Sequence, residues 1–110
     1  NAISTCRCAA ICDTDEQSLR QALRAAHGSP QGLRDHRELL ARKDISAVLI
    51  ATPSYKHCAI ARDALEAGKH VFVENPLFFK LEEAKVLKAA ADAHASQVLQ
   101  VGLQRRYSKF

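Results

Sequence analysis

The segment that decides the fold is residues 47–57, which read Ala47-Val-Leu-Ile-Ala-Thr-Pro-Ser-Tyr-Lys-His57. Its first five residues are apolar and predict a short buried strand. The Thr-Pro-Ser sequence at 52–54 predicts a turn whose hydroxyls cap a helix, which we expect from about residue 55 to residue 67, closed by Gly68. A strand that turns directly into a helix is the repeating unit of α/β proteins.

The same unit recurs on both sides of this segment. We expect a strand at residues 7–12, buried on both faces, and a helix capped at Thr14 and stopped at Gly28. Further strands are expected around residues 33–36, 70–74 and 98–101, and further helices at 37–42 and 81–95. Apolar strands that alternate with amphipathic helices indicate crossovers on a mostly parallel sheet, so the predicted class is α/β.

Length and charge exclude several classes of protein. The 110 residues suit one small globular domain. No apolar run approaches the roughly 18–20 residues that cross a bilayer, and we recognise no signal peptide. The net charge is +4, but Arg105, Arg106 and Lys109 account for most of it, which argues against a general nucleic-acid-binding or membrane-binding surface.

The cysteines Cys6, Cys8, Cys12 and Cys58 allow three interpretations: buried reduced thiols, a disulfide framework or a metal site. We favour buried thiols in a reducing compartment such as the cytoplasm, because the chain has enough aliphatic residues for a core. The spacing also lacks the paired C-x-x-C hooks of structural zinc sites, so we predict no metal site.

Polar residues that directly follow strands are the candidates for chemistry, because ligands of parallel sheets bind beyond the carboxyl ends of the strands. Asp13 follows the first predicted strand, where a carboxylate can accept hydrogen bonds from ribose hydroxyls or simply cap a helix; both interpretations stay open. The glycines Gly28, Gly32, Gly68 and Gly102 spell neither G-x-G-x-x-G nor a P-loop, so these residues contain no phosphate-cradling loop.

Three further groups follow the later strands. Thr52 and Ser54 would cap a helix or contact an anion, and His57 lies in the first turn of that helix, where it is either a surface residue or a ligand contact. Glu74-Asn75-Pro76 is a polar turn whose proline can adopt a cis bond. Near the C-terminus, Arg105 and Arg106 precede Tyr107 and would bind an anion or form a solvated tail.

Several segments together resemble one known family. They are residues 47–57, Ala64-Leu-Glu-Ala-Gly-Lys-His-Val-Phe-Val-Glu-Asn-Pro-Leu77, Leu81-Glu-Glu-Ala84 and Val98-Leu-Gln-Val-Gly-Leu-Gln-Arg-Arg-Tyr-Ser108. In order and spacing they resemble the glucose-fructose oxidoreductase and inositol dehydrogenase (Gfo/Idh/MocA) family. Ala9-Ala-Ile-Cys-Asp13 is similar to the family's second strand and its ribose-binding acid.

The resemblance implies a Rossmann-like domain and an oxidoreductase that transfers hydride between nicotinamide and a hydroxyl of a sugar, cyclitol or polyol. It places Asp13, Thr52, Pro53, His57, Glu74 and Asn75 at the cofactor, and Arg106 and Tyr107 at the substrate. Asp13 favours NAD over NADP. The resemblance also implies that the whole protein forms a homo-oligomer. The expectation that it binds neither nucleic acid nor membrane comes from the charge distribution described above.

Three departures from the family pattern qualify this hypothesis. First, the first strand and the glycine-rich turn are not found, so residues 1–102 would form a partial cofactor domain. Second, residues 103–110 would only begin a second domain, which is not found after about Ser108. In the Rossmann order, the first strand lies between the strands ending at Cys12 and Ala51, so we expect the isolated chain to be unstable or to borrow a strand. The 110 residues alone are expected to be inactive.

The third departure is internal, because the family's Glu-Lys-Pro turn reads Glu74-Asn75-Pro76 here. Asn75, at the position of the catalytic lysine, can form hydrogen bonds but cannot carry a positive charge. Two alternative functions follow: a regulatory member that binds dinucleotide or sugar without catalysis, and an NAD-dependent glycosidase of the same family.

Overall fold

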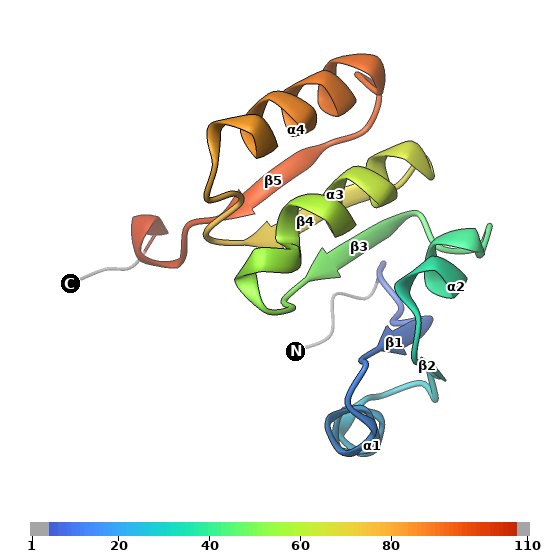
Figure 1. Ribbon diagram of the computed structural model, residues 1–110. Helices are drawn as coiled ribbons and strands as arrows, with labels where there is room; N and C mark the ends of the chain where they lie inside the picture. Colours follow the sequence, from blue (N-terminus) through green and yellow to red (C-terminus); the bar gives the residue numbers. More distant parts are fainter. Residues whose placement is uncertain (1–4, 108–110) are drawn as a thin grey trace. The chain divides into compact units, whose positions relative to one another are not determined.

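The computed structural model describes residues 5–107, whose five strands form two parallel sheets rather than one (Figure 1). The chain divides into two compact units, residues 1–45 (unit 1) and 46–110 (unit 2). The α/β class with parallel strands and flanking helices is confirmed. Within the described residues, β1 pairs only with β2, and β3 pairs only with β4.

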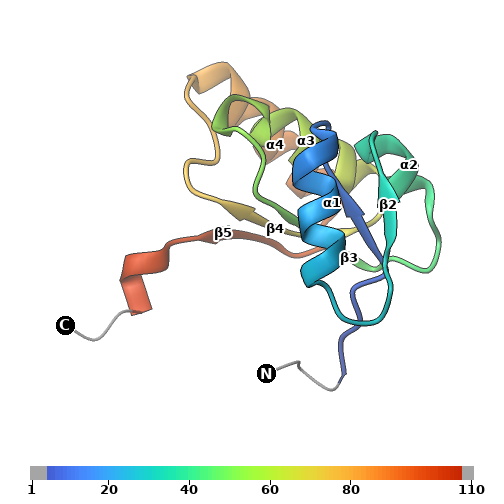
Figure 2. The same cartoon turned by 90° about the horizontal axis from the view of Figure 1, so that it is seen from below.

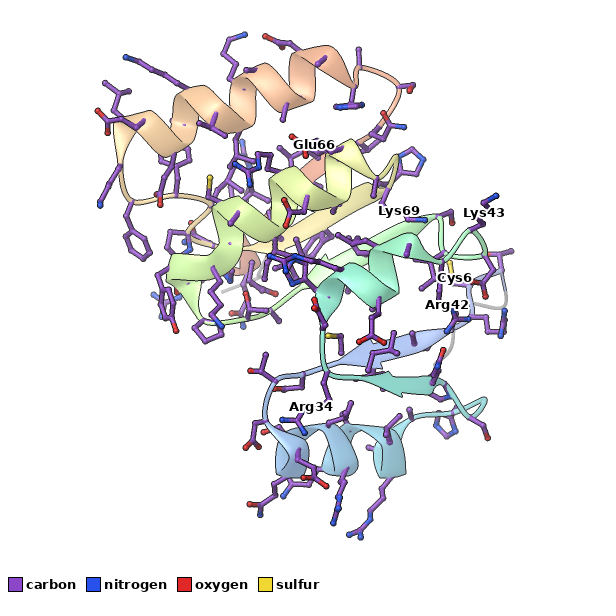
Figure 3. All side chains as sticks on the ribbon, turned by 45° about the vertical axis from the view of Figure 1, so that its right-hand side comes forward. Cys6, Arg34, Arg42, Lys43, Glu66 and Lys69 are labelled. Carbon is purple, nitrogen blue, oxygen red and sulfur yellow. The ribbon has the colours of Figure 1, made fainter. Side chains whose placement is uncertain are left out.

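Unit 1 is a two-stranded sheet between two helices. Strand β1 (Ala10–Cys12) pairs in parallel with β2 (Gln31–Leu33). Helices α1 (Glu16–Ala25) and α2 (His36–Ala41) lie on opposite sides of this pair (Figures 1 and 3). One leucine from each of α1, β2 and α2 is buried between the layers: Leu19, Leu33 and Leu40.

Aspartates start both helices of unit 1. Asp15 caps α1 by accepting a hydrogen bond from the Ser18 amide at 2.7 Å, and Asp35 caps α2 by accepting one from the Arg37 amide at 2.9 Å. The sequence placed the first cap one residue early, at Thr14. Aspartate is at least as good an N-cap as threonine, so residue type alone does not choose between the two positions.

The first strand is shorter and more exposed than we expected. Only Ala10–Cys12 belong to β1, and all three are half-buried. The prediction of buried thiols is therefore wrong for Cys6 and Cys8, which are exposed, whereas Cys58 is buried. Partial burial raises the pKa of the Cys12 thiol, and the carboxylates of Asp35, Asp13 and Glu38 raise it further.

The Arg42 side chain forms hydrogen bonds near the N-terminal ends of both strands of unit 1 (Figure 3). Its Nη1 donates to the Ala9 carbonyl at 3.2 Å, ahead of β1, and to Oε1 of Gln31 in β2 at 3.0 Å. Its Nε and Nη2 form a two-pronged pair with the Asp44 carboxylate at 2.9 and 2.6 Å. The hydrogen bonds from Arg42 lower the pKa of Asp44.

This pair makes the stability of the chain depend on pH. Because the pKa of Asp44 is lowered by folding, its stabilisation is present above about pH 4 and is lost as the pH falls through the folded-state value. We expect Asp44→Asn to lower the urea midpoint at pH 5–8, with the difference shrinking in acid. Asp92→Asn, which removes a surface pair with Lys88, is the control and should change little. A difference that persists undiminished in acid would contradict this account.

Unit 2 has three parallel strands in the order β3 (Ala47–Ile50), β4 (His70–Glu74) and β5 (Leu99–Gly102). Helices α3 (His57–Glu66) and α4 (Leu81–Ala93) cover the same face of this sheet (Figure 2). The buried side chains between sheet and helices are Val48, Ile50, Val71, Val73, Ala61, Ala64, Leu65, Leu87 and Ala90.

Side chains on the other face of this sheet remain exposed. Burial alternates along β3 and β4, so Leu49 is 81% exposed and Phe72 is 36% exposed.

The predicted strands and helices of unit 2 are confirmed, with shifts of one or two residues at most of their ends. Leu81, the first residue of α4, is 66% exposed. Among residues 5–107, no helix is long and apolar enough to span a membrane.

Candidate functional site

The carboxyl ends of β3, β4 and β5 meet at one edge of the unit 2 sheet. The chain leaves β3 through Thr52 and Pro53 into the short 3₁₀ helix η1 (Ser54–Lys56), and leaves β4 through Asn75 and Pro76. It leaves β5 into a second 3₁₀ helix, η2 (Gln104–Tyr107). The predicted site residues of unit 2 all lie on these three segments.

A pocket of about 540 Å³ lies beyond the ends of β4 and β5. One side is formed by Glu74 and Asn75, and the other by Gly102, Leu103, Gln104, Arg105 and Arg106. It therefore combines a carboxylate, carboxamides and two guanidinium groups, which can bind the hydroxyls of a polar ligand. Arg105 and Arg106 contribute to this pocket rather than forming only a solvated tail.

Gly102 allows the two sides of the pocket to approach closely. It pairs in register with Glu74, and a Cβ atom at this position would lie 2.8 Å from Cζ of Phe72 and 3.2 Å from Oε2 of Glu74. Any larger residue would have to displace the Phe72 ring or the Glu74 carboxylate. From the sequence alone, Gly102 is one of four glycines that form no phosphate-binding motif; the register between β4 and β5 is what reveals its role.

We expect Gly102→Ala to lower the free energy of unfolding by about 1 kcal/mol, at the low end for overpacking, because the half-exposed Phe72 ring can move outward. A double-mutant cycle by urea denaturation checks the cause. In a Phe72→Ala background the cost of Gly102→Ala should be much smaller. Equal costs in both backgrounds would mean that the ring is not what the new methyl group meets.

His57 joins two of the three segments. The residue is only 2% exposed, with Nδ1 at 2.7 Å from the Pro76 carbonyl oxygen and Nε2 at 2.8 Å from the Thr52 carbonyl oxygen. Both ring nitrogens are therefore engaged by backbone, so the ring does not offer a nitrogen to a ligand. The Asn75–Pro76 peptide bond is cis.

The hydroxyls of the Thr-Pro-Ser turn do not cap a helix, contrary to our expectation. Neither η1 nor α3 has a side-chain cap, and Thr52 Oγ1 lies 3.4 Å from the Pro53 carbonyl oxygen. The turn is instead closed by the Lys56 amide, which donates to that same carbonyl at 2.9 Å. Thr52 and Pro53 do not line the described pocket, but His57 connects their turn to the turn that does.

Asp13 lies in unit 1, directly after β1. Its backbone amide donates to the Leu33 carbonyl at 3.1 Å, and its Oδ1 accepts a hydrogen bond from the Asp15 amide at 2.8 Å. Asp13 therefore stabilises the turn before α1, while Asp15 caps the helix itself. Its position at the carboxyl end of a parallel strand is the one we predicted for a ribose contact.

The remaining predictions have mixed outcomes. Arg106 lines the pocket, whereas the side chain of Tyr107 lies outside the described part of the structure. Leu103 and Gln104 also line the pocket. They lie in the segment that carries the family resemblance, but the sequence assigns neither of them a role of its own. Within residues 5–107, no group of three or more His, Cys, Asp or Glu side chains is arranged to hold a metal ion.

Comparison with known proteins identifies similar chains. Residues 1–103 match the model of a family described as oxidoreductases with an NAD-binding Rossmann fold, Gfo/Idh/MocA. An inositol 2-dehydrogenase/D-chiro-inositol 3-dehydrogenase of Halalkalibacterium halodurans is 34% identical over 99% of this chain and 31% of its own length. A glycosyl hydrolase family 109 protein of Shewanella amazonensis is 41% identical over 76% of this chain and 20% of its own length.

Solved structures give the same result. Scyllo-inositol dehydrogenase from Lactobacillus casei, with bound NAD(H) and scyllo-inositol, superposes with a TM-score of 0.83 at 30% identity. The match covers 92% of this chain and 29% of that one. The chain thus spans about a third or less of the length of these relatives.

Proposed function

The chain belongs to the Gfo/Idh/MocA family of oxidoreductases with an NAD-binding Rossmann fold. On this basis we propose that it is part of an NAD-dependent dehydrogenase. The reaction is hydride transfer between nicotinamide and a carbinol carbon of a sugar, cyclitol or polyol. The observation that carries the proposal is the pocket beyond β4 and β5, where Glu74, Asn75 and Arg106 lie together. Such groups bind ligands that are rich in hydroxyls.

The chain's residues fit parts of the cofactor. Asp13 supplies carboxylate oxygens for the adenosine ribose hydroxyls and would repel the 2′-phosphate of NADP, which supports NAD. Glu74, Asn75 and the turn at Thr52 and Pro53 would hold the nicotinamide end. When bound, NAD supplies the hydride acceptor. No residue among the 110 replaces a glycine-rich turn for the pyrophosphate.

A second candidate function is glycoside cleavage. It is favoured by the glycosyl hydrolase family 109 relative from Shewanella amazonensis, which is 41% identical over 91 aligned residues. In such a reaction NAD would be reduced and reoxidised within one turnover. Sugar released from a glycoside without net NADH would identify it, whereas NADH that accumulates with a free polyol would identify the dehydrogenase.

Titration with NAD and NADP tests the cofactor proposal, using the protein at the length of its relatives. We expect NAD to bind more tightly than NADP, and Asp13→Ala to weaken NAD binding by about ten- to a hundredfold, the loss of a hydrogen bond to a charged group. Asp92→Ala, on the exposed side of α4, is the matched carboxylate control. Equal affinity of wild type and Asp13→Ala for NAD would rule out the ribose contact.

A further inference from the structure

Among residues 5–107, the ring of His57 faces two hydrogen-bond acceptors and has no donor partner at either nitrogen. Nδ1 lies 2.7 Å from the carbonyl oxygen of Pro76, and Nε2 lies 2.8 Å from the carbonyl oxygen of Thr52. A carbonyl oxygen can only accept. A neutral imidazole carries one N–H, so it would leave the lone pair of its other nitrogen pointing at an oxygen lone pair.

We infer that His57 is an imidazolium cation in the folded protein and that it is a positioning residue for the proposed cofactor site. Both contacts then become N–H donations to carbonyl oxygens. Their lengths, 2.7 and 2.8 Å, fall in the range of about 2.7–2.9 Å that is typical of charge-assisted hydrogen bonds. This role differs from both interpretations that the sequence allowed for His57, a surface residue or a direct ligand contact.

Two effects oppose a charged ring, and the two carbonyls have to outweigh them. The ring is buried, and His57 is the first residue of α3, where the helix dipole is positive. Ionisable residues on the surrounding segments include Tyr55, Lys56 and Cys58 near it in the chain, Glu74 before the Pro76 turn, and Glu83 on α4, which contacts Cys58. Among the described contacts none of them hydrogen-bonds to the ring, so the carbonyl oxygens are the groups that favour the second proton.

The two carbonyls belong to the turns that matter for the site. Thr52 lies in the turn after β3, and Pro76 follows Asn75, which lines the pocket. A doubly protonated ring holds both turns at once, whereas a neutral ring releases one of them. The positioning role rests on the proposed function, but the charge of the ring does not.

His70 is a neutral reference in the same protein for measuring the charge of His57. Its Nδ1 accepts a hydrogen bond from the Val98 amide at 3.0 Å, so it is unprotonated there and the ring is neutral. His27, in the loop after α1, is exposed. One sample therefore contains a histidine expected to keep both ring protons, a neutral one and an exposed reference.

Ring ¹⁵N NMR of the histidine-labelled protein at pH 7.5 tests the charge without cofactor. We expect two protonated ring nitrogens for His57 and one for His70. The His57 signals are assigned by their loss in His57→Gln or, where that variant does not fold, by elimination with variants of the other histidines. One unprotonated nitrogen in the His57 ring at pH 7.5 overturns the inference.

The pH profile of NAD affinity tests the positioning role. In the wild type the affinity should fall by about three- to tenfold as the pH rises and His57 loses its second proton, the loss expected of one hydrogen bond. His57→Gln should bind weakly with a flat profile, and His27→Gln should behave as wild type. A flat wild-type profile across the NMR-detected deprotonation overturns the positioning role. Absence of NAD binding at every pH contradicts the proposed function and leaves the NMR result intact.

Discussion

Replacing Asn75 with lysine, in the protein at the length of its relatives, is expected to raise kcat for NAD-linked polyol oxidation by about 10²–10⁴-fold. Asn75 forms the wall of the pocket next to Glu74, so a lysine there would place an ammonium group beside the proposed substrate hydroxyl. An ammonium group can exchange a proton and stabilise developing negative charge, whereas a carboxamide can do neither.

Two further substitutions separate charge from proton transfer. Asn75→Arg restores a positive charge but no exchangeable proton near neutral pH, and Asn75→Gln keeps a neutral amide. We expect rates in the order lysine, arginine, glutamine, measured as NADH formation with a panel of sugars, cyclitols and polyols. NAD affinity, measured in parallel, shows that each variant still binds the cofactor.

The outcome decides between two hypotheses on this family member. If the lysine variant binds NAD but reduces none across the panel, the loss of the cation does not explain the departure at Asn75. The alternative interpretation, a member that binds dinucleotide or sugar without catalysis, would then be favoured. A wild-type rate as high as that of the lysine variant would instead mean that another group supplies the proton transfer.

Leu65→Ala is expected to lower the free energy of unfolding by about 2–5 kcal/mol. Leu65 lies on α3, is completely buried, and belongs to a helix that packs against both β4 and α4. Truncation removes apolar contacts and leaves a cavity that the closely packed surroundings cannot fill. Small domains have free energies of unfolding of only about 5–15 kcal/mol, so this change is a large fraction of the stability of such a domain.

Leu49→Ala is the matched control. It removes the same atoms from the same unit, but Leu49 is 81% exposed on the open face of the sheet. We expect a change of less than about 0.5 kcal/mol. Urea denaturation followed by circular dichroism measures both, and a loss at Leu49 as large as at Leu65 would show that the open face is covered in solution.

Much of the fold could be predicted because local signals agree. The strand at residues 70–74 was predicted with its observed limits, since an apolar run is bounded by Gly68 and Pro76. The strand at 7–12 was overestimated, because burial on both faces depends on neighbouring strands and helices that one segment does not reveal. The cap at Asp15 instead of Thr14 was unpredictable for a related reason: neighbouring residues of similar capping strength compete, and packing selects one.

The sequence predicted which segments form the candidate site but not the contacts between their residues. The rule that ligands bind beyond the carboxyl ends of strands located Glu74, Asn75 and Arg106, and the structure places all three at one pocket. The contacts of His57 could not be predicted, because its partners are backbone carbonyls that carry no signature in residue type. The family resemblance supplied the expected roles, which the proposed experiments test.

The two strands that end at the pocket differ in the number of their hydrogen-bonded neighbours. Strand β4, which ends in Glu74, is hydrogen-bonded on both sides, so its amides exchange only when the sheet itself opens. Strand β5 has a sheet partner on one side among the described residues, and it leads into η2, which carries Arg105 and Arg106. In the described residues we therefore expect the amides of β4 to exchange more slowly than those of η2, which hydrogen-exchange measurements would show for each amide.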